Sequence, residues 1–93
     1  MTVIICRIEL FIASAQSLKD KRQVVKSLIG RIRAKANASV AEVDFHELWQ
    51  RAAVGVAMVG TDSTVLEGQI NLIRRLADDS ENAEVVAFDI EYV

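Results

Sequence analysis

Residues 3–12 alternate their side chains with the two-residue period of a β-strand. Successive side chains of a strand point to opposite faces, so even-numbered and odd-numbered residues form separate faces. The even-numbered face is wholly apolar and is predicted to be core: Ile4, Cys6, Ile8, Leu10 and Ile12. The odd-numbered face mixes apolar and charged side chains: Val3, Ile5, Arg7, Glu9 and Phe11. The chain must therefore cover one face of this strand, and the other face is free for a different role.

Two segments with helical spacing of apolar residues, 17–36 and 63–79, are predicted to supply that cover. The first begins at Ser17, with Asp20 in the place of a capping-box glutamate and Asn37 as a left-handed cap at its end. Its apolar stripe consists of Leu18, Val25, Leu28, Ile29, Ile32 and Ala36. The second helix carries Val65, Leu66, Ile70, Leu72, Ile73, Leu76 and Ala77, with Gln69 inside the same arc.

Three further strands are predicted at residues 40–45, 50–60 and 84–93. The first two are predicted to form a hairpin, and Gly55 marks a bulge or a close backbone approach. The last strand is expected to place Val86, Phe88, Ile90 and Tyr92 on one face and Val85, Ala87, Asp89 and Glu91 on the other. The order βαββαβ predicts an α+β fold, the ferredoxin-like plait, in which a four-stranded antiparallel sheet carries two helices on one face.

The length of 93 residues predicts a single domain, residues 1–93. Cys6 is the only cysteine, which excludes an intrachain disulfide and a thiolate zinc cluster and suits a reducing, cytoplasmic setting. No membrane segment is expected, because apolar runs such as residues 10–13 fall far short of the roughly 20 residues of a spanning helix. With one histidine, no glycine-rich phosphate loop and no serine elbow, the chain is predicted to be neither an enzyme nor a cofactor carrier.

The net charge of -2 conceals a strong asymmetry along the chain. Residues 17–36 hold seven basic side chains and one acidic, whereas residues 78–93 hold six acidic side chains and no base. Helical geometry places four of the basic residues within an arc of about 60°, in a row about 21 Å long beside the apolar stripe. We call Lys19, Arg22, Lys26 and Arg33 the basic row. The row predicts contact with nucleic-acid phosphates; a solvated helix face, or neutralisation by the acidic C-terminal region, is the alternative.

Two residues at the start of the third strand are secondary candidates for nucleic-acid binding. Trp49 could stack on a base or anchor a partner protein, or it could cover the end of the core, and Arg51 follows it closely. Base stacking on the sheet itself is not expected, because only Phe11 offers a ring on the outer side of the first strand.

A different class of function, assembly of like subunits, is suggested by the outer face of the sheet. Apolar area beside complementary charges there fits a two-fold dimer or other homo-oligomer: Val3, Ile5, Arg7, Glu9, Phe11, Val85 and Asp89. Glu42, Asp44 and His46 would share one face of an extended strand, but this spacing is weak evidence and no metal site is expected. A small-molecule sensor is a third class of function, and no sequence signature in the loops supports it.

Five short runs form one combination of motifs: residues 17–22, 31–33, 37–43, 49–52 and 55–57. Together they resemble the bacterial YlxP-like family of small proteins of unassigned function, and Ala36 departs from the aromatic residue that the family tends to carry there. The resemblance implies a ferredoxin-like domain and brings no catalytic residues. In many bacteria the family is encoded beside transcription and translation factors, including ribosome-binding factor A. That neighbourhood implies ribosomal or pre-ribosomal RNA as the expected partner.

Overall fold

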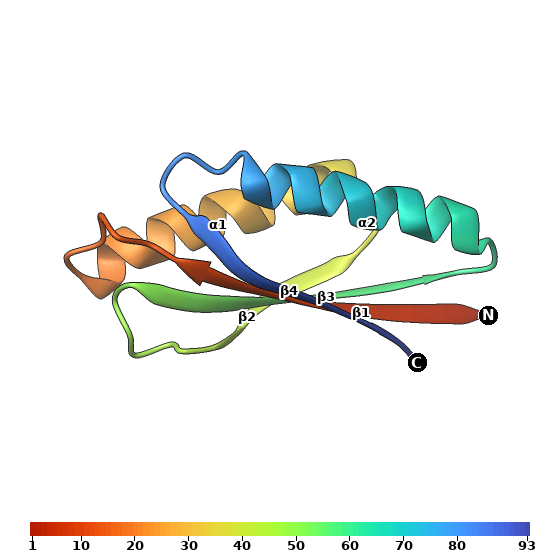
Figure 1. The fold of residues 1–93 in the computed structure, drawn as a ribbon, viewed down its shortest axis with the longest axis horizontal. Helices are drawn as coiled ribbons and strands as arrows, with labels where there is room; N and C mark the ends of the chain where they lie inside the picture. Colours follow the sequence, from red (N-terminus) through yellow and green to blue (C-terminus); the bar gives the residue numbers. More distant parts are fainter.

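The structure is a computed structural model that describes residues 1–93 and shows the predicted order of elements. The strands are β1 (Thr2–Phe11), β2 (Ser39–Asp44), β3 (Arg51–Gly60) and β4 (Glu84–Tyr92), and the helices are α1 (Leu18–Lys35) and α2 (Ser63–Asp78). The paired strands are all antiparallel, in the order β2-β3-β1-β4. Both helices lie on one face of the sheet, and the other face is open (Figure 1). The ferredoxin-like plait is thereby confirmed.

The core lies between the helices and one face of the sheet. β1 supplies its centre, because Ile4, Cys6, Ile8 and Leu10 are all 0% exposed. α1 contributes Val25, Leu28 and Ile32, and α2 contributes Leu66, Ile70, Ile73 and Ala77. Burial of Cys6 raises the pKa of its thiol. Neither helix is both long and apolar enough to cross a membrane.

The two ends of α1 are formed differently. At its start Ser17 Oγ accepts a hydrogen bond of 3.1 Å from the backbone N–H of Asp20, as the capping pattern predicts. At its end the prediction for Asn37 is wrong: Ala36 is the cap with an extended backbone, and the only positive φ outside glycine belongs to Phe45. The N–H of Asn37 instead donates to Gln69 Oε1 at 2.9 Å. The glutamine within the apolar arc of α2 therefore ties the two helices together.

Two members of the predicted arc of α2 lie outside the core. Val65 is 56% exposed and Leu72 is not packed against the core, whereas Leu66, Ile70 and Ile73 are buried. At 100° per residue Val65 and Leu72 lie about 110° and about 130° around the helix from the middle of these buried residues. The apolar arc predicted from the sequence was therefore too wide on this side.

A bulge in β4 corrects the predicted faces of that strand. Ala87 lies opposite Glu9, but Val85 lies opposite Leu10, so the register shifts by one residue between them. A bulge places one extra residue in a strand and reverses the alternation beyond it. Val85 therefore shares the helix-covered face with Leu10 and packs against the core. Its assignment to an interface on the open face was wrong.

A second bulge, in β2, explains Gly55. The pairing with β3 shifts between Glu42 and Asp44, which leaves Val43 as the extra residue. A Cβ atom on Gly55 would lie 2.8 Å from Val43 Cγ1. Gly55 is therefore closely approached, as predicted, but by the side chain of Val43 and not by a backbone, and the bulge lies in β2 and not at Gly55.

Candidate nucleic-acid interface

The basic row lies on the exposed surface of α1, as predicted. The capped start of the helix and the buried stripe of Val25, Leu28 and Ile32 fix its rotation on the sheet. With that rotation, all four members of the row are exposed: Lys19, Arg22, Lys26 and Arg33. A rigid helix therefore presents four cations in one line, at fixed spacing.

Arg33 shows which flank of α1 the row occupies. Its Nη2 donates a hydrogen bond of 2.7 Å to the carbonyl oxygen of Val40 in β2. β2 is an edge strand of the sheet. The row therefore runs along the flank of α1 above this edge, and its C-terminal member is held against the edge strand.

The charges of the row are not neutralised by carboxylates of the same chain. The four ion pairs in the structure are made by Arg7, Lys21 and Arg51. The acidic residues Asp79 and Glu81 line a cleft with Ser27 and Arg31, on the other flank of α1. Within one chain, the acidic C-terminal region therefore does not neutralise the basic row.

Lys21, one of the seven basic residues of this segment, is not on the surface. Its side chain is 0% exposed, and its Nζ donates hydrogen bonds to the backbone carbonyls of Phe45 at 2.8 Å and His46 at 3.2 Å. The same Nζ lies 3.1 Å from Glu42 Oε2. A buried charge is stable only when it is paired in this way, so Lys21 is an anchor for the chain after β2.

The segment after β2, residues 45–50, is held at the N-terminal end of α1. Lys21 fixes its first two carbonyls, and Gln50 Nε2 donates to the carbonyls of Ala13 and Ala15 just before α1. Trp49 in this segment is 54% exposed and does not cover the end of the core. Trp49 therefore belongs to a segment that is anchored at the end of α1 where Lys19 and Arg22 lie.

Arg51 does not join the basic row. Its guanidinium lies over the ring of Phe45, 4.1 Å from the centroid, and its Nη2 is 3.4 Å from Glu9 Oε2. Glu9 and Arg51 both belong to the open face of the sheet, which is opposite to the helices. The structure therefore assigns Arg51 to the open face of the sheet and not to the basic row on α1.

The charged residues predicted for a subunit interface pair mainly within the chain. Arg7 Nη2 lies 3.2 Å from Glu9 Oε1 and 3.1 Å from Asp44 Oδ2. The hydrogen bond to Asp44 is the main cause that raises the pKa of Arg7. The pKa of Asp44 is lowered, first by the hydrogen bond from the Phe45 N–H and next by the hydrogen bond from Arg7. Ala53, opposite both Glu9 and Asp44, is 0% exposed beneath this cluster. Part of the open face is therefore covered by its own side chains.

Other predicted members of that interface do remain on the open face. Ile5 is 39% exposed, Val3 and Phe11 are half-buried, and Asp89 stands opposite Arg7 in the register. Val43 and Val59 add exposed apolar area, at 49% and 54%. The face that the sequence proposed for self-association thus exists without Val85, and two of its three charged residues, Arg7 and Glu9, already pair within the chain.

Glu42, Asp44 and His46 do not share a face. The bulge at Val43 turns Glu42 toward Lys21 on the helix side and Asp44 toward Arg7 on the open side. His46 Nε2 forms a hydrogen bond of 3.2 Å with the backbone carbonyl oxygen of Glu42. The alternation assumed from the sequence is wrong here, because one extra residue separates the two carboxylates by face.

Solved structures agree with this fold. A de novo designed protein with a ferredoxin fold matches with a TM-score of 0.55 at 13% identity, over 100% of this chain and 84% of that one. A REP-associated tyrosine transposase bound to a REP hairpin matches with a TM-score of 0.54 at 11% identity, over 99% of this chain and 56% of that one. At these identities the likeness concerns the fold alone.

Sequence comparison goes further than fold. The uncharacterized protein YlxP of Bacillus subtilis (strain 168) is 32% identical over 76 residues, which is 82% of this chain and 83% of that protein. The model of a family described as "Protein of unknown function (DUF503)" matches residues 3–90. The chain therefore belongs to the DUF503 family, whose YlxP-like members it resembled in sequence.

Proposed function

We propose that this protein is a non-enzymatic, cytoplasmic RNA-binding protein whose partner is ribosomal or pre-ribosomal RNA. The observation that carries the proposal is the basic row, in which Lys19, Arg22 and Lys26 are exposed and make no ion pair within the chain. Phosphates neutralised by such side chains release condensed counterions, which drives binding at low salt. The row spans about 21 Å of helix, enough to meet several phosphates of a structured RNA.

Trp49 supplies the second part of the proposed surface. An exposed indole is suited to stack on an unpaired base, which phosphate contacts alone do not recognise. Leu48 beside it is 45% exposed and enlarges the apolar part of the same segment. The surface therefore combines a charged row for the RNA backbone with a ring for a loop or bulge. The transposase with the same fold is bound to a REP hairpin, which is compatible with this use of the fold.

Self-association through the open sheet face stays a prediction of a different class. Exposed Ile5, Val43 and Val59 favour it. However, Arg7 and Arg51 pair with Glu9 and Asp44 of the same chain, so these charges are not left for a second subunit. RNA binding is therefore the better supported function.

The proposal is tested by reversing two charges of the row. We expect Lys19→Glu/Lys26→Glu to weaken binding to purified small-subunit ribosomal RNA by about 100-fold or more at low salt. Removing two phosphate contacts should also reduce the slope of log K against log salt by about 1.5. Filter binding over a range of salt concentrations measures both quantities.

A matched control separates the row from net charge. Lys35→Glu/Arg75→Glu changes the net charge equally at exposed positions outside the row, and we expect its affinity to stay within about 3-fold of the original. Equal losses in both double variants, or no loss in the first, would contradict the proposal.

A further inference from the structure

A polar cleft lies on the flank of α1 opposite to the basic row. Its cavity of about 630 Å³ is bounded by α1, by the loop that precedes α1 and by the turn between α2 and β4. This volume falls within the range of roughly 300–1,000 Å³ that is usual for small-molecule sites. Arg31 projects into it, about 150° around α1 from the middle of the basic row. The cleft is therefore separate from the proposed RNA surface.

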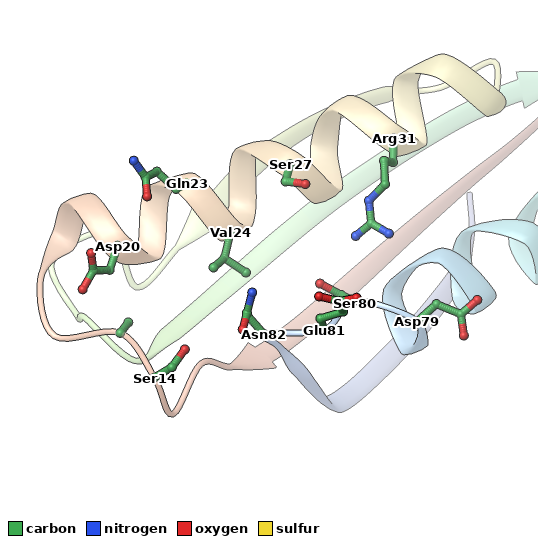
Figure 2. Close-up of a pocket in the computed structure, with 11 residues that line it drawn as sticks. Ser14, Asp20, Gln23, Val24, Ser27, Arg31, Asp79, Ser80, Glu81 and Asn82 are labelled. Atoms are coloured by element: carbon green, nitrogen blue, oxygen red, sulfur yellow. The ribbon is translucent and has the colours of Figure 1, made fainter.

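Arg31 is the residue that marks the cleft as a binding site. Its guanidinium points from α1 toward Ser80 and Glu81 of the facing turn (Figure 2). Its Nε is buried and has no hydrogen-bond partner in the protein. Because this atom is closed to solvent, a ligand in the cleft meets the terminal Nη1 and Nη2 of the guanidinium, which make no ion pair within the protein. A guanidinium in this state is well suited to receive the two oxygens of a carboxylate.

The other charges of the cleft decide what kind of ligand fits. Asp79 and Glu81 lie on the turn that faces Arg31, and neither carboxylate is in an ion pair with it. A phosphate or another dianion would be repelled by these carboxylates, and a diamine would be repelled by Arg31. A ligand that carries one carboxylate and one ammonium group is complementary to both.

Neutral polar groups complete the lining. Gln23 and Ser27 on α1 and Asn82 on the turn offer amide and hydroxyl groups, and Ala15 and Val24 are the only apolar residues of the cleft. The carboxylate of Asp20 is occupied at the start of α1, where it accepts from the backbone N–H of Gln16. The lining therefore favours a small, polar ligand over an apolar one.

We propose that this cleft binds a free α-amino acid or a compound of the same zwitterionic type. Arg31 holds the carboxylate, and the carboxylate of Glu81 receives the ammonium group, whereas the Asp79 side chain points away from Arg31 (Figure 2). Because the ligand bridges α1 and the turn between α2 and β4, its binding stabilises the folded chain. The site is independent of the basic row, so either proposal can fail without the other.

The test is a thermal-shift screen of the full chain against the individual L-α-amino acids, followed by calorimetric titration. At a concentration about tenfold above Kd, a bound amino acid is expected to raise Tm by roughly 5–10 °C. The N-acetyl derivative lacks the ammonium group and is expected to bind at least 10-fold more weakly. The corresponding amine, which lacks the carboxylate, is also expected to bind at least 10-fold more weakly.

Two variants locate the site, and a third variant serves as the control. Arg31→Gln and Glu81→Gln should each weaken binding of the amino acid at least 10-fold. Because Glu81 is exposed, its variant keeps the test valid if the Arg31 variant folds poorly. Arg75→Gln, on α2 outside the cleft, should leave binding unchanged. The proposal is overturned if no amino acid shifts Tm, if the N-acetyl derivative binds equally well, or if inorganic phosphate binds instead. The proposal is also overturned if the Arg31→Gln and Glu81→Gln variants bind the amino acid as tightly as the original protein.

Discussion

Replacement of Lys21 with methionine is expected to lower the free energy of unfolding by about 3 kcal/mol, because it removes one partner of a buried ion pair. Lys21 is 0% exposed and Glu42 is 16% exposed, so the carboxylate that remains is poorly hydrated. The carbonyls of Phe45 and His46 also lose their donor. Methionine fills most of the volume of the lysine stem, so the loss reports the polar contacts rather than a cavity.

Urea unfolding of the two proteins measures this effect, and Lys19→Met is the matched control. Lys19 lies two residues earlier on the exposed side of α1, and its replacement should change stability by less than about 0.5 kcal/mol. A double-mutant cycle with Glu42→Gln should show a coupling of about 1 kcal/mol or more between the two side chains. If Lys21→Met is as stable as Lys19→Met, Lys21 is not the anchor described above.

Ile8→Ala is expected to lower the free energy of unfolding by about 3 kcal/mol, because it opens a cavity in the core between the sheet and the helices. Ile8 is 0% exposed in the central strand β1, with Val54 of β3 opposite on one side and Phe88 of β4 on the other. Strands on both sides limit how far the backbone can move to fill the space. Thermal or urea unfolding of the variant measures the loss.

Ile5→Ala tests the opposite face of the same strand. Ile5 is 39% exposed, so its replacement should cost less than about 1 kcal/mol at every protein concentration. A cost equal to that of Ile8→Ala would contradict the assignment of faces. A cost that grows with protein concentration would show that the open face is buried between subunits, since oligomer stability follows mass action.

The order of elements could be predicted from the sequence because each element repeats its own period over many residues. The alternation in residues 3–12 and the apolar stripes of the two helices indicate strand and helix without reference to the rest of the chain. The faces of β2 and β4 could not be predicted in full. A bulge such as that at Val86 is decided by pairing with the neighbouring strand, and simple alternation carries no sign of it.

The basic row was predicted from helical geometry alone, and all four members are exposed as expected. Lys21 was missed as an anchor because its charge was counted with the surface residues. A signal was present: Leu18, Lys21, Val25, Leu28 and Ile32 follow one another at spacings of three and four, which places the lysine within the apolar stripe. Its partner Glu42 and the Phe45 carbonyl are more than 20 residues away, so the pairing itself required the fold.

The most direct test of the RNA-binding surface is to titrate the isotope-labelled protein with a small-subunit ribosomal RNA fragment and follow backbone NMR resonances. The account predicts that the largest shifts occur at Lys19, Arg22, Lys26, Arg33 and residues 45–50, and that they fade as salt is raised. Shifts confined to the open face of the sheet, around Val3, Ile5 and Val59, or no shifts at any salt concentration, would contradict it.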